Sequence, residues 1–334
     1  MNKKQADSFK YILGKNNFIN CIIDYCKNYK ISNPIKIYLV GGFVRDLFNN
    51  NFEQTFDLDL AIEGDIDKFT KELADKFSLN IKKTHNFLNY KIYSESGNLD
   101  IAHCRKETYP NAGALPIWKP ANIIEDLFRR DITINAIAIE ILEDNFEVID
   151  PLNGIKDINE KLIKIIHSKS FLDDPTRIYR CIKYKARLNY KFETNTEKTI
   201  FDSLSQIENI SKFRKNNEIL KFLDENNIQN IIEQSLNNIK FKKIFPKRFM
   251  GKISYIDKSY WDGLTMNYKI FFAMFENDEK SIDDFLSSLN FSKPDKTLVK
   301  ELFSIKSKLS INKNINIENL DVDDAFISNL YHCL

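Results

Sequence analysis

Residues 35–46 read IKIYLVGGFVRD, and residues 56–62 read FDLDLAI. The first six residues form a short run rich in Ile and Val that ends at Gly41 and Gly42. Such a run predicts a strand that leads into a tight turn, with a helix beginning over Phe43–Phe48. The second stretch alternates apolar and acidic residues, which is typical of a strand with one polar face. The two stretches together predict the start of a mixed α/β unit.

The apolar pattern on either side extends this unit. Helices are expected over 1–30, Asp67–Phe77 and Ile124–Ala138, strands over Leu99–Cys104 and Phe146–Ile149, and a loop over 108–122. Strand signals fade after about residue 160. Helical patterns follow over Ser170–Arg187, Asn195–Asn209 and several short stretches of 215–334. The fold class expected is therefore α+β, with a mixed head followed by an all-helical remainder.

Composition limits the class of protein without naming its function. The 334 residues carry 49 Lys and Arg against 47 Asp and Glu, a net charge of +2, so charge alone does not indicate a nucleic-acid partner. The five cysteines form no CxxC pair, which favours reduced thiols. We find no apolar run of membrane-spanning length and no secretory signal. We therefore expect a cytoplasmic protein with no membrane partner.

The glycine pair predicts a phosphate site. Glycines let the backbone approach a ligand closely, and a helix that begins there presents free N–H groups to an anion. The two glycines and Arg45 are the candidate contacts, since a guanidinium can bind phosphate through two parallel hydrogen bonds. A plain strand–turn–helix corner is the alternative for a single glycine pair.

The sequence DLD predicts a metal site. Asp57 and Asp59 are two residues apart on a strand, so their side chains point to the same face. Adjacent carboxylates repel each other and are tolerated where a hard cation such as Mg²⁺ lies between them. A solvated face of an edge strand is the alternative. Asp100, on the next predicted strand, is a possible third carboxylate or only a polar residue of the sheet face.

Two later motifs combine arginines with aspartates. Residues 129–136 read RRDITINA, and residues 173–180 read DDPTRIYR. In the second motif Arg177 and Arg180 are three residues apart, and Lys183 extends their row on one helical face. The aspartates of this motif suit the N-terminus of a helix. Taken singly, each motif also fits a solvated helix with surface ion pairs.

In this order, GGFVRD, DLD, RRDITINA and DDPTR resemble the motifs of the class II tRNA nucleotidyltransferases, a family that includes bacterial poly(A) polymerases. The stretches RKETYP and GALP, over 105–110 and 113–116, are also similar to that group. The resemblance covers roughly residues 36–195. It implies a DNA polymerase β-like head with a five-stranded mixed sheet over 1–160, a helical neck over 161–230, and a helical body and tail over 231–334.

The resemblance also implies roles for particular residues. Asp57 and Asp59 would be the catalytic ligands of Mg²⁺. The residues implied in nucleotide binding are Gly42, Arg45, Arg130, Asp131, Asp174, Arg177, Arg180 and Lys183. Asp174 and Arg177 would be the pair that selects the nucleotide. Two positions depart from the family pattern: Asp173 stands in place of Glu, and Lys183 stands where Arg is usual and lacks its planar fork.

The tail matches no motif of the family. Its one basic cluster consists of Lys240, Lys242, Lys243, Lys247, Arg248 and Lys252, interleaved with Phe241, Phe245 and Phe249. The phenylalanines are expected in the core, whereas the cations fit either a phosphate track along the acceptor stem or a solvated helix face.

The function implied is addition of the 3′-terminal CCA to tRNA from CTP and ATP, with the tRNA 3′ end and acceptor stem as partner. No obligate protein partner is evident. An A-adding enzyme, a CC-adding enzyme and a poly(A) polymerase remain open, since they share the same head, and residues 109–116 look like those of some A-adding relatives. A non-catalytic RNA-binding module is the alternative from another class. An intact acidic pair argues against it, because a site without a metal has no reason to keep that repulsion.

Overall fold

The computed structural model describes residues 9, 11, 14–50, 57–84, 88–94, 97–225, 228, 231–233, 241, 243–246, 248–249, 251, 255–256, 258–311 and 324–334. The chain folds into two compact units. The first comprises Met1–Asp173 and Lys191–Thr199, and the second comprises Asp174–Tyr190 and Ile200–Leu334.

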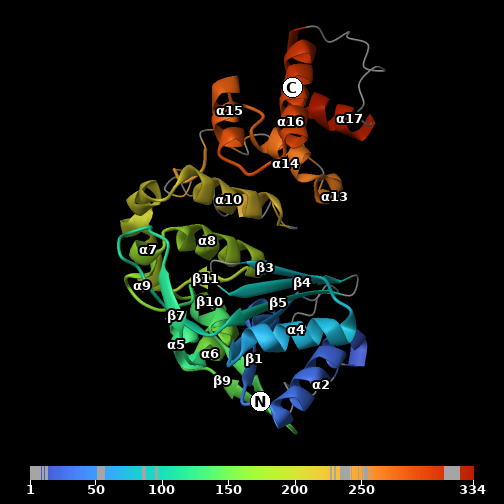
Figure 1. The fold of residues 1–334 in the computed structure, drawn as a ribbon. Coiled ribbons are helices and arrows are strands. Elements are labelled where there is room, and N and C mark those ends of the chain that lie inside the picture. The colour runs from blue at the N-terminus through green and yellow to red at the C-terminus, as the bar shows by residue number, and fades with distance from the viewer. Residues whose placement is uncertain are drawn as a thin grey trace. The chain divides into compact units, whose positions relative to one another are not determined.

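A mixed sheet forms the centre of the first unit (Figure 1). Its seven strands lie in the order β3-β4-β5-β2-β1-β8-β9, so the expectation of five strands was wrong. Their bounds are β1 Lys36–Val40, β2 Asp57–Glu63, β3 Ile81–Thr84, β4 Asn89–Ser94, β5 Gly97–His103, β8 Ala138–Ile141 and β9 Phe146–Ile149. Only β2 and β5 pair in parallel, and the other neighbours are antiparallel.

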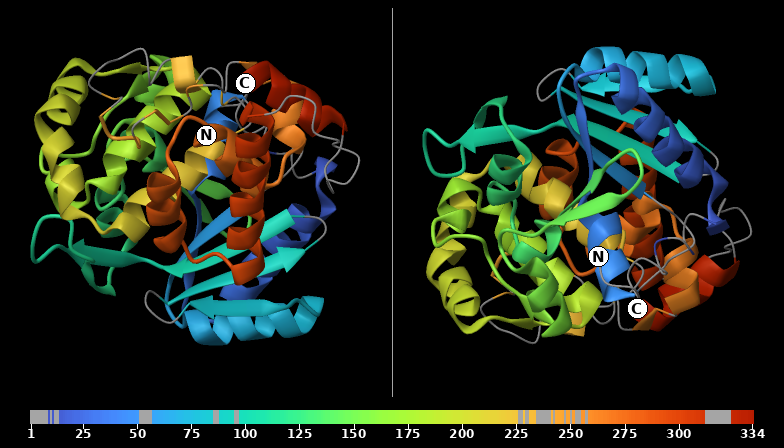
Figure 2. Two further views of the ribbon diagram at one scale, coloured as in Figure 1. Left: turned by 90° about the horizontal axis from the view of Figure 1, so that it is seen from above. Right: turned by 90° about the horizontal axis from the view of Figure 1, so that it is seen from below.

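Helices pack on this sheet. They are α2 Asn17–Ser32, α3 Gly41–Asn49, α4 Ile66–Phe77 and α5 Ile123–Phe128. The unit also contains α6 Gly154–Asn159, which contacts α3, and α7 Ser170–Asp173. α4 begins where the Asp65 side chain accepts a hydrogen bond from the Lys68 amide, a standard N-cap. α2 and α4 lie side by side, with the rings of Tyr25 and Phe69 5.8 Å apart. Figure 2 shows α4 beside the sheet from two further directions.

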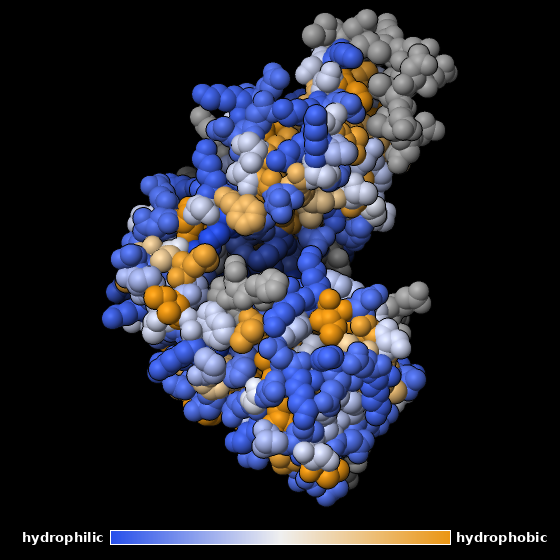
Figure 3. Space-filling view, in the orientation of Figure 1, coloured by the Kyte–Doolittle hydropathy of each residue, from blue (hydrophilic) through white to orange (hydrophobic). Residues whose placement is uncertain are grey.

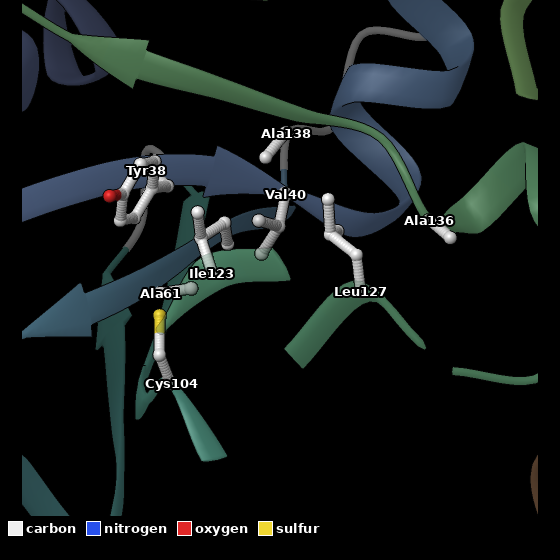
Figure 4. Packing of buried hydrophobic residues seen from close by; sticks show 8 residues of the cluster. All are labelled: Tyr38, Val40, Ala61, Cys104, Ile123, Leu127, Ala136 and Ala138. Atoms are coloured by element: carbon white, nitrogen blue, oxygen red, sulfur yellow. The ribbon is translucent and has the colours of Figure 1, made fainter. Parts of the chain in front are cut away.

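One face of the sheet is covered by α5 through a small apolar cluster. Ile123 and Leu127 of α5 pack with residues of β1, β2 and β8 (Figure 4). The other members of the cluster are Tyr38, Val40, Ala61, Cys104, Ala136 and Ala138. Val40 pairs with Asp59 in the strand register, so this cluster covers the same face up to the acidic pair.

Two short sheets stand apart from the main one. β6 Arg105–Thr108 and β7 Ile117–Pro120 form an antiparallel hairpin, and β10 Leu162–Ile163 pairs in parallel with β11 Lys191–Phe192. The loop expected over 108–122 is therefore shorter, because its last part is a strand. A proline is tolerated at position 120 because it lies at the end of an edge strand, where the missing N–H is not needed.

The helix expected over Ile124–Ala138 was also wrong. α5 ends at Phe128, a 3₁₀ turn covers Thr133–Asn135, and β8 begins at Ala138. Ile132, Ile134 and Ile137 are buried between α5 and β8, and an apolar run alone does not distinguish such a segment from a buried helix.

The second unit is helical in its described residues. Its helices are α8 Thr176–Leu188, α10 Lys212–Leu223, α13 Lys258–Gly263, α14 Met266–Ala273, α15 Glu279–Ser287, α16 Lys293–Ile311 and α17 Asp324–Cys333. α9 Thr194–Ser203 and a 3₁₀ helix over Leu204–Asn209 precede α10 and divide the helix expected there. Pro175 separates α7 from α8, because proline disfavours a helical conformation in the residue before it.

None of the described helices is both long and apolar enough to cross a membrane. The surface seen in Figure 3 is mostly hydrophilic over the described residues, with hydrophobic side chains in small separate groups. The isolated groups need no special explanation on a protein surface.

Candidate active site

The acidic pair lies on β2 as the alternation predicted. Asp57 is exposed and Asp59 is partly buried, whereas Leu58 and Leu60 between and after them are buried on the opposite face. Asp57 accepts a hydrogen bond of 2.8 Å from the Asn98 amide, its register partner on β5. The two carboxylates therefore share one face at the edge of the apolar cluster.

Asp100 joins this face through the strand register. It lies directly opposite Asp59 in the parallel pair of β2 and β5. Its Oδ2 accepts a 2.6 Å hydrogen bond from Lys91 Nζ on β4. Asp100 therefore lies next to Asp59 in the sheet, and its carboxylate is hydrogen-bonded to Lys91.

Burial raises the pKa of Asp59 to about 6. Arg130 opposes this shift, and the charges of Asp100 and Asp57 add to it. A carboxyl in this environment gains most from a nearby cation, because the cation favours the charged form that burial disfavours.

Within the described residues, no group of three or more His, Cys, Asp or Glu side chains is arranged to hold a metal ion. Mg²⁺ in phosphoryl-transfer sites is usually held by one or two carboxylates together with substrate phosphates. The donor set of Asp57 and Asp59 fits that kind of site, with hard oxygen ligands on one face.

Gly41 lies against Asp59, and the family resemblance had singled out only its neighbour. Gly41 has φ +75°, and a Cβ built on it would lie 2.3 Å from Asp59 Oδ2. A side chain at this position is therefore excluded by both the backbone conformation and the carboxylate. Gly42 is less constrained, since its nearest neighbour is Arg45 Nη2 at 3.6 Å. The glycine pair itself was the available signal.

α3 begins at Gly41 and has no side-chain cap from the described residues. Its first amides can therefore serve an anion. Arg45 is buried and its guanidinium donates to both oxygens of Asp46, at 2.8 Å each, and to the Asn135 side chain at 3.0 Å. The bidentate partner of Arg45 in this structure is thus Asp46, and its contact with a nucleotide stays a prediction.

Asn135 connects two of the sequence motifs. Besides accepting from Arg45, it donates weakly to Asp131 Oδ1 at 3.4 Å. Asp131 is 5% exposed and also accepts from the Ile132 amide. The motifs around Arg45 and Asp131 therefore form one polar cluster, although they are far apart in the sequence.

The arginines of the RRD motif are held by a buried carboxylate and are not surface pairs. Asp126, 1% exposed, accepts from Arg129 at 2.7 Å and from Arg130 at 3.0 Å. Burial alone would raise the pKa of Asp126, but Arg130 and Arg129 hold it below its ordinary value. Arg129 also pairs with Glu107 on the β6–β7 hairpin. Sequence reasoning missed both acids, which carry no motif of their own.

The second unit carries the remaining predicted residues on and before α8. Asp174 Oδ1 accepts from the Thr176 amide at 3.0 Å, the Thr176 hydroxyl at 2.7 Å and Arg214 at 2.8 Å. Its Oδ2 accepts no hydrogen bond from the residues that the structure describes. Arg177 follows in the first turn and is 5% exposed. Sequence reasoning missed Arg214, which lies on α10.

Farther along α8, basic side chains gather around one tyrosine. Arg180 and Lys183 each lie 5.7 Å from the centre of the Tyr184 ring. Lys183 is buried and pairs with Glu225 at 3.6 Å, and burial lowers its pKa. Arg187 also pairs with Glu225. A nucleotide contact for Arg180 and Lys183 stays a prediction.

The basic cluster of the tail is described only in part. Lys240, Lys242, Lys247 and Lys252 lie outside the described residues, whereas Lys243 and Arg248 are exposed. The expectation that the interleaved phenylalanines belong to the core is confirmed, since all three are buried: Phe241, Phe245 and Phe249.

The first unit is similar to a known domain. Residues 37–164 match the family model of the poly(A) polymerase head domain. An A-adding tRNA nucleotidyltransferase of Aquifex aeolicus (strain VF5) is 37% identical over 202 residues, which cover 60% of this chain and 24% of the relative. The chain thus spans about a quarter of that relative's length.

Two further matches extend over more of the chain. A CCA-adding enzyme of Staphylococcus epidermidis (strain ATCC 12228 / FDA PCI 1200) is 26% identical over 317 residues, 91% of this chain and 75% of the relative. A crystal structure of a tRNA nucleotidyltransferase complexed with a primer tRNA and an incoming ATP analog has a TM-score of 0.68 and 25% identity. The alignment covers 89% of this chain and 91% of the chain in that structure. The head over residues 37–164 thus matches the poly(A) polymerase head-domain family, and the longer matches of the chain are to tRNA nucleotidyltransferases.

Proposed function

We propose that the protein builds or repairs the 3′-terminal CCA of tRNA from CTP and ATP without a nucleic-acid template. The observation that carries this proposal is the acidic pair Asp57 and Asp59 on one face of β2, next to the side-chain-free surface of Gly41. The 3′-OH of the tRNA attacks the α-phosphate of the nucleotide, and pyrophosphate leaves. No covalent protein intermediate is required.

Asp57 and Asp59 hold the catalytic ion, which we propose to be Mg²⁺. When bound, the ion lowers the pKa of the attacking hydroxyl and neutralises charge on the phosphates. Asp100 is a possible third ligand. The uncapped N-terminus of α3 at Gly41 and Gly42 binds the triphosphate through backbone N–H groups.

Arg45, Arg130 and Asp131 complete the nucleotide site. Their shared contacts with Asn135 favour this assignment, because Asn135 accepts from Arg45 through its side chain and from Arg130 through its backbone carbonyl at 3.1 Å. Residues held in this way lose little conformational entropy when a nucleotide binds.

Asp174 and Arg177 select the base by hydrogen-bond complementarity. Cytosine and adenine both present an amine donor beside a ring-nitrogen acceptor, whereas uracil and guanine present the reverse. A carboxylate only accepts and a guanidinium only donates, so this pair suits C and A. The Oδ2 atom of Asp174, which accepts from none of the described residues, supports the role. Arg180 and Lys183 add positive charge on the same helix.

The tRNA binds through its 3′ end and acceptor stem, with the helical neck over 161–230 and the body and tail over 231–334 as its contacts. The basic cluster from Lys240 to Lys252 is the proposed phosphate track. These substrates suit a cytoplasmic location. The proposed reaction needs no membrane and no obligate protein partner.

An A-adding enzyme is the second candidate. The A-adding relative of Aquifex aeolicus has the higher identity, 37%, but the match spans only 24% of it. The CCA-adding relative is matched over 75% of its own length, which favours CCA addition.

Incubation with three tRNAs separates the candidates. The tRNAs end at the discriminator base, at C and at CC, and each receives CTP or ATP alone. A CCA-adding enzyme extends the first two with CTP and the third with ATP. An A-adding enzyme extends only the third, a CC-adding enzyme never uses ATP, and a poly(A) polymerase adds long A tails to all three. A non-catalytic RNA-binding module extends none.

A further inference from the structure

A row of charged side chains crosses four neighbouring strands at the level of the acidic pair. Asp59 on β2 is opposite Asp100 on β5, Asp100 is opposite Lys91 on β4, and Lys91 is opposite Lys82 on β3. Residues paired across strands point to the same face of a sheet. The row therefore reads acid, acid, lysine, lysine along one face.

Lys91 and Asp100 form the contact in the middle of the row. Lys91 Nζ lies 2.6 Å from Asp100 Oδ2, and the two side chains are 46% and 42% exposed. An ion pair this exposed adds little to the stability of the fold, so its removal should leave the protein folded. Lys82 has the same charge and lies next in the row, but it forms no ion pair with a described residue.

The number of carboxylates that can reach an ion largely sets the affinity of an oxygen-ligand site. Asp57 and Asp59 give two. Asp100 lies opposite Asp59 and would give a third if Lys91 released it. The lysine also places a positive charge beside the position of the cation, which repels it.

We propose that Lys91 is an internal counter-ion that holds Asp100 away from the metal-binding pair and keeps the site's affinity for a bare divalent ion low. The inference rests on the proposed function of Asp57 and Asp59. If Lys91 has this role, the site binds a divalent ion tightly only together with a nucleotide, because the phosphates then supply the missing ligands. Lys91 is a positioning residue in this account, acting through Asp100.

The test is binding of Mn²⁺ alone, without nucleotide or tRNA, followed by electron paramagnetic resonance of the free ion. Lys91→Met should bind Mn²⁺ about three- to tenfold more tightly than the wild type, because it frees a carboxylate and removes one opposing charge. Lys82→Met removes a neighbouring charge without touching Asp100, and Lys91→Arg keeps the pairing. Both should bind Mn²⁺ like the wild type.

A second substitution tests the route through Asp100. Adding Asp100→Asn to Lys91→Met should abolish most of the gain, since the freed side chain then lacks a charged ligand. Equal gains in Lys91→Met and Lys82→Met would overturn the proposal, as would a gain that survives Asp100→Asn. Unchanged Mn²⁺ affinity with weaker CTP binding in Lys91→Met would make Lys91 a phosphate ligand and would also overturn it.

Asp59→Asn distinguishes this inference from the function on which it rests. If Asp59→Asn does not weaken Mn²⁺ binding, the proposed metal site itself is wrong. If Asp59→Asn abolishes binding while Lys91→Met leaves it unchanged, only the role of Lys91 fails. Thermal unfolding of each variant in the absence of ions checks that all of them are folded.

Discussion

At the scale of single residues, the side chain of Asp59 lies directly against the backbone of Gly41. A Cβ on Gly41 would lie only 2.3 Å from Asp59 Oδ2, and Gly41 has a φ that favours glycine. The glycine therefore allows a charged side chain to lie directly beside the N-terminus of α3. This close approach brings the proposed metal ligand and the proposed phosphate-binding amides together.

We predict that Gly41→Ala lowers the free energy of unfolding by about 1–3 kcal/mol and abolishes most nucleotide addition, because both the backbone and Asp59 must move. Gly42→Ala is the matched control for stability, because a Cβ on Gly42 would lie 3.6 Å from its nearest neighbour, Arg45 Nη2, and Gly42 lies within a helix. Urea unfolding measures both variants. Equal stability of the two variants would contradict the role given to Gly41.

Asp126 gives a pH-dependent prediction that does not involve the metal. Its pKa is lower in the folded protein than in the unfolded chain, so its stabilising contribution is present above about pH 4 and is lost as pH falls through its folded pKa. Asp126→Asn should therefore lower the free energy of unfolding by about 3–5 kcal/mol at pH 7. The difference from the wild type should narrow between pH 5 and pH 3.

Urea unfolding at pH 7, 5 and 3 measures this difference. Glu125→Gln is the neighbouring control, since Glu125 is exposed and its one ion pair with a described residue is the surface pair with Lys106. It should stay close to the wild type at each pH. A constant difference between Asp126→Asn and the wild type would mean that packing, and not charge, explains the effect.

The residue scale also marks the limit of sequence reasoning. The shared face of Asp57 and Asp59 follows from strand alternation alone, and the structure confirms it. The contact of Arg45 with Asn135 joins residues 90 positions apart, and that of Lys91 with Asp100 depends on strand register. A local motif specifies neither which distant residue a side chain contacts nor the register of two strands. These contacts could therefore be found only from the structure.

At the scale of elements, the N-terminus of α8 carries the proposed selection of the base. Asp174 and Arg177 lie within one turn of each other, and Thr176 and Arg214 fix one oxygen of the aspartate. A carboxylate held in this way presents its other oxygen in a defined direction. The sequence predicted that the aspartates lie at the N-terminus of a helix, but not the contact with the arginine from α10.

We predict that Arg177→Ala loses selectivity for CTP and ATP over UTP and GTP beyond any general loss of rate. Each mismatched buried contact costs about 1–3 kcal/mol, so the wild type should discriminate by orders of magnitude and the variant by much less. Arg187→Ala is the control on the same helix, since Arg187 pairs with Glu225 and lies away from the first turn.

Single-nucleotide incorporation of all four triphosphates measures this selectivity. The control should keep the wild-type order of preference. Equal proportional losses for all four triphosphates in Arg177→Ala would mean that the arginine only holds phosphate or supports the helix.

The elements also differ in how well their sequences predict them. β1, β2, α4 and β9 have clear periodicity and flanking glycines or caps, and each was predicted within one residue or so. The helix predicted over 124–138 was wrong because the buried Ile132, Ile134 and Ile137 lie between α5 and β8, where an apolar run alone does not distinguish a helix from the approach to a strand. β4 alternates buried and exposed residues, a signal that was present in the sequence but short.

At the scale of the whole molecule, the chain consists of a mixed α/β unit and a helical unit. The proposed metal ligands belong to the first unit, and Asp174 and Arg177 belong to the second. In the proposed function, tRNA binds the helical unit through the basic stretch from Lys240 to Lys252. The net charge of +2 does not reveal this stretch, because its cations are concentrated in a short part of the sequence.

We predict that replacing Lys242, Lys243 and Lys247 by Gln weakens tRNA binding and reduces the slope of log K against log salt by about 2–3. Lys280, Lys293 and Lys296, which are exposed or partly exposed on α15 and α16, form the control set. Their replacement should leave the slope unchanged. Equal slopes for the wild type and the first variant would return the stretch to a solvated surface.

The central claim is tested most directly by sequencing the 3′ ends of a tRNA that lacks CCA after incubation with all four nucleotides. The wild type should produce ends that read C, C and A and then stop, and Asp59→Asn should produce no extension while still binding the tRNA. Wild-type tails of A alone, ends that contain U or G, or normal CCA ends made by Asp59→Asn would contradict the account.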